Sequence, residues 1–115
     1  MAAIHSGNAV DDGSPYRGWV VGNFIDSEQG IRHTSDVSIK WGIHPAGWVR
    51  EKWMTGETRT TFSMLISGRF RIQLSEGDFL LTKPGDYLMW GPGVDHIAQA
   101  EEDSVVLTVR WQEPE

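Results

Sequence analysis

One histidine that follows a rigid corner late in the chain is the best candidate for chemistry. A Pro-Gly-Asp turn at residues 84–86 leads into four apolar residues, a Gly-Pro-Gly corner occupies residues 91–93, and His96 comes three residues later. An imidazole can bind a metal ion, carry a proton or hydrogen-bond to a ligand. The corner restricts the backbone where any polar turn would serve. We therefore predict that His96 points into a pocket, with hydrogen bonding to its neighbours alone as the alternative.

Polar residues at every second position between residues 55 and 63 form a second candidate group. If one strand runs through this segment, its two-residue period places the following residues on one face, toward the interior: Thr55, Glu57, Arg59, Thr61 and Ser63. The hydroxyl residues of this set are predicted to contact a ligand. Glu57 is predicted to act with His96, or else to pair with Arg59 at a rim or lie in a surface loop, because an unpaired buried carboxylate is costly.

Aromatic residues are unusually frequent, with six tryptophans among 115 residues. Such a number indicates an aromatic-walled cavity or a subunit interface. We predict that Trp53, Tyr87 and Met89 line the binding pocket. Tyr87 and Met89 share one face of their strand, whereas Leu88 and Trp90 share the other, so only one of these pairs can face the interior.

Short β-type runs separated by turns fill the chain from residue 16 onward. Their apolar and polar residues alternate, and no ten-residue stretch shows a helical period. Roughly eight such runs with frequent turns predict an all-β sandwich or barrel over residues 16–115. Residues 1–15 are predicted to form a flexible N-terminal arm. The clearest runs are 19–25, 37–43, 60–66, 69–74, 79–82, 87–90 and 104–111, and a two-residue hairpin at 67–68 is predicted to join the third and fourth.

For two of these strands, the sequence differs in how clearly it indicates which face points to the interior. In the run 37–43, Trp41 shares an apolar face with residues 37, 39 and 43, and is predicted to lie in the core or an interface. In the run 104–111, Thr108 and Arg110 lie opposite Leu107 and Val109. The sequence leaves open which of these two sets faces the cavity.

Charge and composition exclude several classes of protein. The net charge of −6 argues against a partner that is nucleic acid, since phosphate binding requires a basic surface. The lack of cysteine excludes disulfides and thiolate chemistry, and predicts a cytoplasmic protein. No apolar run reaches the length of a membrane span, and the N-terminus does not have the form of a signal peptide.

The corner and its histidine resemble the second sequence motif of the small single-domain cupins, the RmlC-like cupins. That motif has a glycine, an extended segment, a proline-glycine corner, and a histidine three residues after the glycine. Gly85, Pro92, Gly93 and His96 match it, with one extra residue before the corner. The resemblance covers about residues 35–111. It implies a double-stranded β-helix, or jelly-roll barrel, that encloses a pocket.

The first cupin motif, which carries two histidines and a glutamate as metal ligands, is degenerate in this chain. Counted back from the glycine at residue 68, the glutamate position falls on Thr61. The histidine positions fall on Thr55 and Glu57, or alternatively on Met54 and Gly56. At least three of the four family ligands are therefore missing. A divalent iron, nickel, manganese or zinc cofactor is disfavoured, because such ions need three or four converging donors.

These observations favour a cupin that binds a small organic molecule without a tightly bound metal. One alternative is a metal-independent isomerase, cyclase or lyase that uses His96 as acid or base. Another is an atypical metal-dependent cupin enzyme of the dioxygenase type. We also expect a homodimer, since small cupins commonly pair through an edge sheet and exposed strand edges need covering. The predicted contact surface is the apolar face of Phe62, Met64 and Ile66 with the N-terminal arm.

Overall fold

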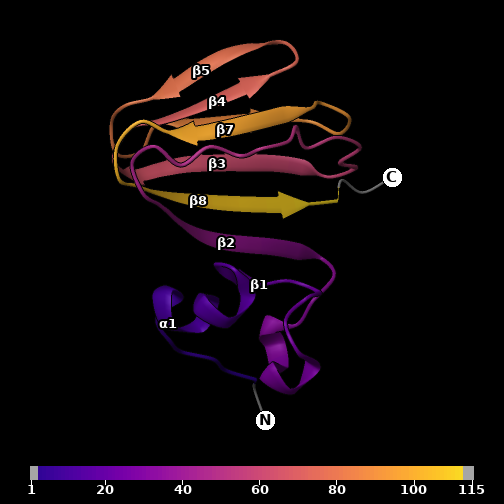
Figure 1. The fold of residues 1–115 in the computed structure, drawn as a ribbon. Helices are drawn as coiled ribbons and strands as arrows, with labels where there is room; N and C mark the ends of the chain where they lie inside the picture. Colours follow the sequence, from indigo (N-terminus) through magenta and orange to yellow (C-terminus); the bar gives the residue numbers. More distant parts are fainter. Residues whose placement is uncertain (1–2, 113–115) are drawn as a thin grey trace.

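Antiparallel strands form two sheets that face each other in the computed structural model, which describes residues 3–112 (Figure 1). The larger sheet has the order β1-β2-β8-β3-β6, and the smaller has the order β5-β4-β7. The strands of the larger sheet are β1 Trp19–Val21, β2 Val37–His44, β8 Ser104–Trp111, β3 Thr60–Ser67 and β6 Tyr87–Trp90. Those of the smaller sheet are β5 Gly77–Leu81, β4 Phe70–Leu74 and β7 His96–Ala100. The predicted all-β class is confirmed.

The inner faces of β3 and β8 change from apolar to polar along their length. Three cross-strand pairs lie in register here, Leu65 with Val106, Ser63 with Thr108, and Thr61 with Arg110. Because alternate residues of a strand point to the same side, all of these side chains lie between the two sheets. One end of the interior is therefore apolar and the other is polar.

The apolar end forms the hydrophobic core. Its residues come from both sheets and are at most 9% exposed. Leu65 is fully buried, and Ile72 of β4 lies among the same residues at 2% exposed. Burial of such side chains is the main favourable term in folding. The complete cluster is Leu65, Phe70, Ile72, Leu74, Leu81, Trp90, Ala100 and Val106.

Two strands differ from the sequence prediction. β7 was not among the predicted runs, because its sequence His-Ile-Ala-Gln-Ala contains two alanines, which have low strand propensity. β1 is shorter than the predicted run 19–25 and ends at Val21. It is an edge strand that pairs with β2 alone, and an irregular register interrupts the pairing between Trp19 and Val21.

The N-terminal segment carries short helices in the region predicted to be an arm. Helix α1 (Ala9–Gly13) begins after Asn8, whose side-chain oxygen accepts a hydrogen bond from the backbone N–H of Val10 at 2.9 Å. A 3₁₀ turn, η1 (Ser14–Tyr16), follows it. Within residues 3–112, no helix has the length and apolar character needed to cross a membrane. The flexibility of the arm stays a prediction.

A buried arginine ties this N-terminal segment to the sheet. Arg32 ends a second 3₁₀ element, η2 (Ser27–Arg32), and is only 5% exposed. Its Nη2 donates to the carbonyl of Asp12 at 2.9 Å, and its Nε donates to the carbonyl of Val20 at 2.9 Å. These bonds connect the helical segment, β1 and η2, which lie together beyond β2 in Figure 1.

The connection at residues 67–68 is a corner between the sheets, so the predicted hairpin is wrong. β3 pairs with β6 and β8, whereas β4 pairs with β5 and β7. Gly68 has a φ of +98° and lies against the backbone at Asp103 and Ser104, where a Cβ would overlap the carbonyl oxygen of Asp103. The sequence signals of a hairpin and of such a corner are the same, because both need a glycine with positive φ.

Gly68 needs both a positive φ and the absence of a side chain, and a comparison with Gly85 separates these two requirements. Gly85 has a φ of +95° but nothing within 4 Å of the Cβ position, so Gly85→Ala is expected to cost only backbone strain, about 1 kcal/mol. Gly68→Ala adds the overlap with Asp103 and should cost about 3 kcal/mol or more. Urea unfolding of both variants measures the difference. Equal losses would show that close packing at the corner does not matter.

Candidate functional site

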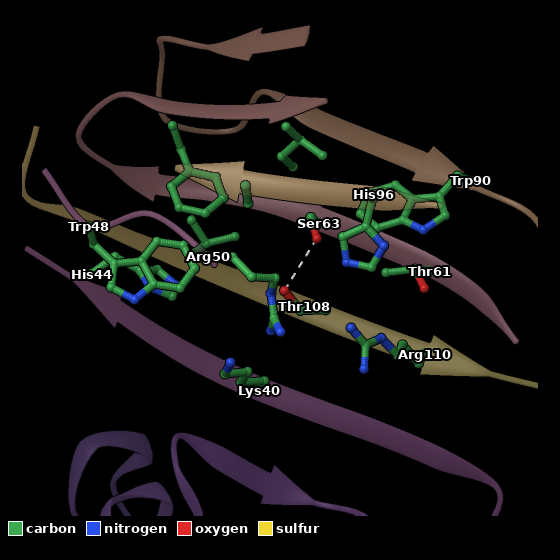
Figure 2. Close-up of a pocket in the computed structure, with 14 residues that line it drawn as sticks. Lys40, His44, Trp48, Arg50, Thr61, Ser63, Trp90, His96, Thr108 and Arg110 are labelled. Carbon is green, nitrogen blue, oxygen red and sulfur yellow. Dashed lines mark hydrogen bonds between the residues drawn. The ribbon is translucent and has the colours of Figure 1, made fainter. Parts of the chain in front are cut away.

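A small pocket occupies the polar end of the sandwich, between the two sheets (Figure 2). Its volume is about 50 Å³. Strands of both sheets contribute to its wall, as does the segment that follows β2. We call this space the inner pocket, and the residues that line it are Lys40, His44, Trp48, Arg50, Thr61, Ser63, Phe70, Ile72, Trp90, His96, Ala98, Val106, Thr108 and Arg110.

His96 lies in the inner pocket and is 6% exposed. It opens β7, where the backbones of His96 and Met54 exchange hydrogen bonds of 2.7 and 3.1 Å. The corner before it is held in place by the Gly93 N–H, which donates to the carbonyl of Glu57 at 2.8 Å. The ring centroid of Trp90 lies 4.8 Å from that of His96. Backbone bonds on both sides thus fix the direction of this imidazole.

Hydroxyl groups from β3 and β8 face this imidazole across the pocket. Thr61 and Ser63 are 0% and 4% exposed. Ser63 Oγ and Thr108 Oγ1 lie 3.2 Å apart and share a hydrogen bond (Figure 2). Thr61 Oγ1 has no such partner among the described residues.

Unpaired polar atoms are concentrated in this pocket. Within residues 3–112, four buried side-chain polar atoms lack a hydrogen-bond partner, and all four belong to residues that line the inner pocket. They are Thr61 Oγ1, Trp90 Nε1, His96 Nδ1 and Arg110 Nε. Leaving a buried donor or acceptor unpaired costs about 1–3 kcal/mol. The pocket therefore offers donors and acceptors that the protein itself does not use.

Three cationic side chains line the same pocket. Figure 2 shows Lys40 on β2, Arg110 on β8 and Arg50 from the segment after β2, with the two guanidinium groups extending toward the space beside His96. The indole of Trp19 lies under two of them, with its centroid 5.6 Å from Lys40 Nζ and 5.2 Å from Arg110 Cζ. Such cation–π contacts stabilise a buried cation without neutralising its charge.

Glu57 pairs with Arg59, which is the rim alternative that the sequence left open. The Arg59 Nε donates to Glu57 Oε1 at 2.9 Å, and the backbone N–H of Arg59 donates to the same oxygen at 3.0 Å. These hydrogen bonds hold the pKa of the Glu57 carboxyl below its ordinary value. Its other oxygen lies 4.0 Å from Arg110 Nη1. Glu57 does not line the inner pocket.

Both histidines of the inner pocket are held neutral at physiological pH. Burial, with smaller contributions from the nearby cations Arg110 and Arg50, lowers the pKa of His96 to about 4. Burial, followed by repulsion from Lys40 and Arg50, lowers the pKa of His44 to about 4. The pocket thus combines neutral imidazoles with permanent positive charges.

Comparison with known proteins identifies the fold. No family profile and no curated protein sequence matches the chain. Among solved structures, it resembles KdgF from Halomonas sp. with 24% identity and a TM-score of 0.62, over 73% of this chain and 77% of that one. A cupin superfamily protein from Desulfitobacterium hafniense DCB-2 shares 16% identity with a TM-score of 0.64, over 70% and 72% of the two chains. A cupin protein from Bacteroides fragilis shares 18% identity with a TM-score of 0.58, over 69% and 68%.

The chain has the cupin fold. The predicted jelly-roll barrel is thereby confirmed, together with the resemblance that His96 and its corner indicated. At these identities, the comparisons establish the fold alone.

The residues inside this cupin barrel do not fit a divalent metal ion. Among residues 3–112, no three His, Cys, Asp or Glu side chains come together as a metal site requires. His96 faces the hydroxyl residues Thr61 and Ser63 instead of further imidazoles. The guanidinium groups of Arg50 and Arg110 also line the pocket and repel a cation.

Several predicted binding residues lie outside the inner pocket. Trp53, Tyr87 and Met89 are 46%, 61% and 47% exposed, and Thr55 is also exposed. β6 pairs with β3 so that Trp90, opposite Thr61, faces the interior. Tyr87 and Met89 consequently lie on the outer face, which corrects their predicted position in the cavity wall.

The cationic part of the wall on β2 was not predicted from the sequence. The alternation in this strand was recognised, and its apolar face with Trp41 was predicted to lie in the core or an interface. The cupin barrel turns the polar set inward, so that Lys40 and His44 line the pocket while Ile43 is 59% exposed. No signal within the strand shows this, because a lysine at the centre of a polar face is equally typical of a face that contacts water.

The path of the segment that follows β2 was not predicted from the sequence. Residues 47–54 in fact run along β7, where the Ala100 N–H donates to the carbonyl of Trp48 at 2.8 Å and the Arg50 N–H donates to that of Ala98 at 3.0 Å. This pairing brings the side chains of Trp48 and Arg50 into the pocket. The pairing partner lies about fifty residues away, and no local pattern signals it.

The neutral histidines predict a pH dependence of stability. Between the folded pKa of about 4 and the ordinary value of 6.5, the unfolded chain binds more protons than the folded protein. The free energy of unfolding should therefore rise with pH through this window and be lost as the pH falls through it. We expect on the order of 2 kcal/mol per histidine, allowing for the solvent that reaches the pocket.

Urea unfolding at a series of pH values from 4 to 7 measures this dependence. Above about pH 5, where the carboxyl groups contribute little, His96→Gln should flatten the slope by about half, because His44 supplies the remainder. An unchanged slope in His96→Gln, or equal stability at pH 4.5 and 6.5 in the unsubstituted protein, would contradict the assignment of buried neutral imidazoles.

Proposed function

We propose that this cupin barrel binds a small organic molecule through the polar groups of its inner pocket, without a tightly bound metal. The observation that carries the proposal is the gathering of unpaired polar atoms around one space. Thr61 Oγ1 can donate or accept a hydrogen bond, whereas Arg110 Nε and Trp90 Nε1 can only donate. A bound molecule that supplies the matching groups would offset the cost of burying them.

Acid–base catalysis at His96 has less support than binding. A general base works best when its pKa lies near the working pH, and that of His96 is about 4. Its predicted partner Glu57 is engaged with Arg59. A dioxygenase-type reaction has less support again, because the described residues lack a set of metal ligands.

Ligand binding is tested by following tryptophan fluorescence while a library of charged and neutral metabolites is added. Trp48 and Trp90 line the pocket, so occupancy should change their emission. For any metabolite that binds, Thr61→Val should weaken binding about fivefold by removing one hydroxyl, while Thr58→Val on the exposed surface should not. If no member of the library binds, or if both variants bind alike, the proposal fails.

Elemental analysis of the dialysed protein tests the absence of a tightly bound metal. We expect iron, nickel, manganese and zinc each well below one equivalent per chain, because the pocket presents guanidinium groups where metal ligands are needed. One equivalent retained through dialysis would overturn this part of the proposal.

We further propose that the protein is a homodimer that pairs through the outer face of the larger sheet. Two apolar rows cross four strands of this sheet in register. None of their residues is buried, and Phe62 and Tyr87 stack with centroids 5.2 Å apart. An apolar surface of this kind is typical of an interface between copies of a chain. The rows are Trp41, Leu107, Met64 and Tyr87, and Ile39, Val109, Phe62 and Met89.

Sedimentation equilibrium tests this assembly. The expected mass is that of two chains, and Met64→Lys should give the mass of one chain, because it places a charge in the middle of the apolar face. Gln73→Lys, on the exposed side of β4, serves as the control and should leave the dimer intact. A single-chain mass for the unsubstituted protein would contradict the proposal.

A further inference from the structure

The inner pocket is strongly cationic in a protein that is acidic overall. The whole chain has a net charge of −6, yet Lys40, Arg50 and Arg110 line the pocket and no carboxylate does. Glu57, with one oxygen 4.0 Å from Arg110 Nη1, is already paired with Arg59. Three cations in one interior space, with no carboxylate in its wall, are typical of a site that binds an anion.

The three cations lack strong protein partners. Arg110 has a side chain only 12% exposed, and its Nε is unpaired. Arg50 Nη1 contacts the thioether sulfur of Met54 at 3.0 Å, which is a weak acceptor. Within residues 3–112, neither Lys40 nor Arg50 forms an ion pair. Burying cations in this way is unfavourable unless an anion joins them.

Mutual repulsion accompanies this burial. Burial lowers the pKa of Lys40, and repulsion from Arg50 and Arg110 lowers it further. The pKa of Arg110 is also lowered, mainly by burial. A negative charge among the three groups would relieve both effects.

The available space limits how much of a ligand can enter. About 50 Å³ is room for one or two waters, or for an oxyanion group of that size, but not for a whole organic molecule. A second space, the outer hollow, shares Lys40, His44 and Trp48 with the inner pocket and adds apolar walls at Val10 and Ile43. Its volume of about 410 Å³ is typical of small-molecule sites.

We infer that the ligand is an organic anion, whose carboxylate or phosphate group enters the inner pocket beside Arg110, Arg50 and Lys40 and whose apolar part lies in the outer hollow. The planar guanidinium groups can each bind two oxygens of such a group. The hydroxyl of Thr61 and the N–H of Trp90 supply further donors to it. This inference rests on the proposed function, since it assumes that the inner pocket binds a ligand, and it adds the ligand's charge and its position.

Matched pairs of charged and neutral probes test whether the pocket prefers an anionic ligand. The probes are acetate with acetamide, and phenylacetate with phenylacetamide, together with phenyl phosphate. Tryptophan fluorescence or calorimetry measures each dissociation constant. We expect the acids to bind about tenfold more tightly than their amides, and phenylacetate more tightly than acetate because its ring enters the outer hollow. Whichever of phenylacetate and phenyl phosphate binds with the lower dissociation constant shows which oxyanion the site prefers.

Substitution of a pocket lysine separates a binding role from a structural one. Lys40→Met keeps the apolar length of the side chain and removes its charge, so it should weaken phenylacetate binding about tenfold while leaving phenylacetamide unaffected. The same variant should be at least as stable as the unsubstituted protein, because a partly buried cation without an ion-pair partner has been removed. Lys83→Met, in the exposed turn before β6, is the control and should change neither.

The outcomes distinguish the two proposals. If phenylacetate and phenylacetamide bind equally and Lys40→Met affects both alike, the pocket is a ligand site but the inference of an anion is overturned. If neither these probes nor any library metabolite binds, the proposed function itself fails. A loss of stability in Lys40→Met without a change in acid binding also overturns the inference, since the lysine would then be structural.

Discussion

Uncompensated positive charge inside the barrel is the constraint on which the rest of the site depends. The register of β3 with β8 places Thr61 opposite Arg110, and that of β2 with β8 places Lys40 opposite Thr108. Antiparallel pairing in this register leaves no freedom to turn these side chains outward, because a shift by one residue would expose the core. The same strand register therefore determines both the apolar core at one end of the interior and the cationic pocket at the other.

The protein tolerates this charge by several contacts that do not cancel it. Trp19 of the edge strand β1 offers its ring face to Lys40 and Arg110. Glu57 stands 4.0 Å from Arg110 but is shared with Arg59. The imidazoles of His44 and His96 stay neutral and so add no further repulsion. These contacts keep the folded state stable while leaving an excess of positive charge that a ligand can use. Among the described residues, the interior of this cupin barrel thus presents guanidinium and ammonium groups instead of a set of metal ligands.

The sequence revealed the fold better than the site. Strand alternation was sufficient to predict an all-β sandwich or barrel and the inward hydroxyls of Thr61 and Ser63, and the resemblance of the corner and His96 to a cupin motif implied the jelly roll and the place of His96. They failed where the usual rule of apolar inside and polar outside is reversed, as in β2. There the apolar residues face outward, and only the pairing of β2 with β8 determines that Lys40 faces inward. Arg50 and Trp48 could not be predicted for another reason. A long-range pairing with β7 brings them into the pocket, and such a pairing leaves no periodic signal in the sequence.

The titration of His96 by NMR tests the electrostatic account most directly, because this imidazole senses the pocket from within. Arg110 and Arg50 face it with positive charge, and Glu57 and Asp95 act in the opposite direction. The account predicts a pKa of about 4 in the free protein and a rise when phenylacetate binds, since an anion stabilises the protonated ring. A pKa near 6.5 that does not move on addition of the acid would contradict it.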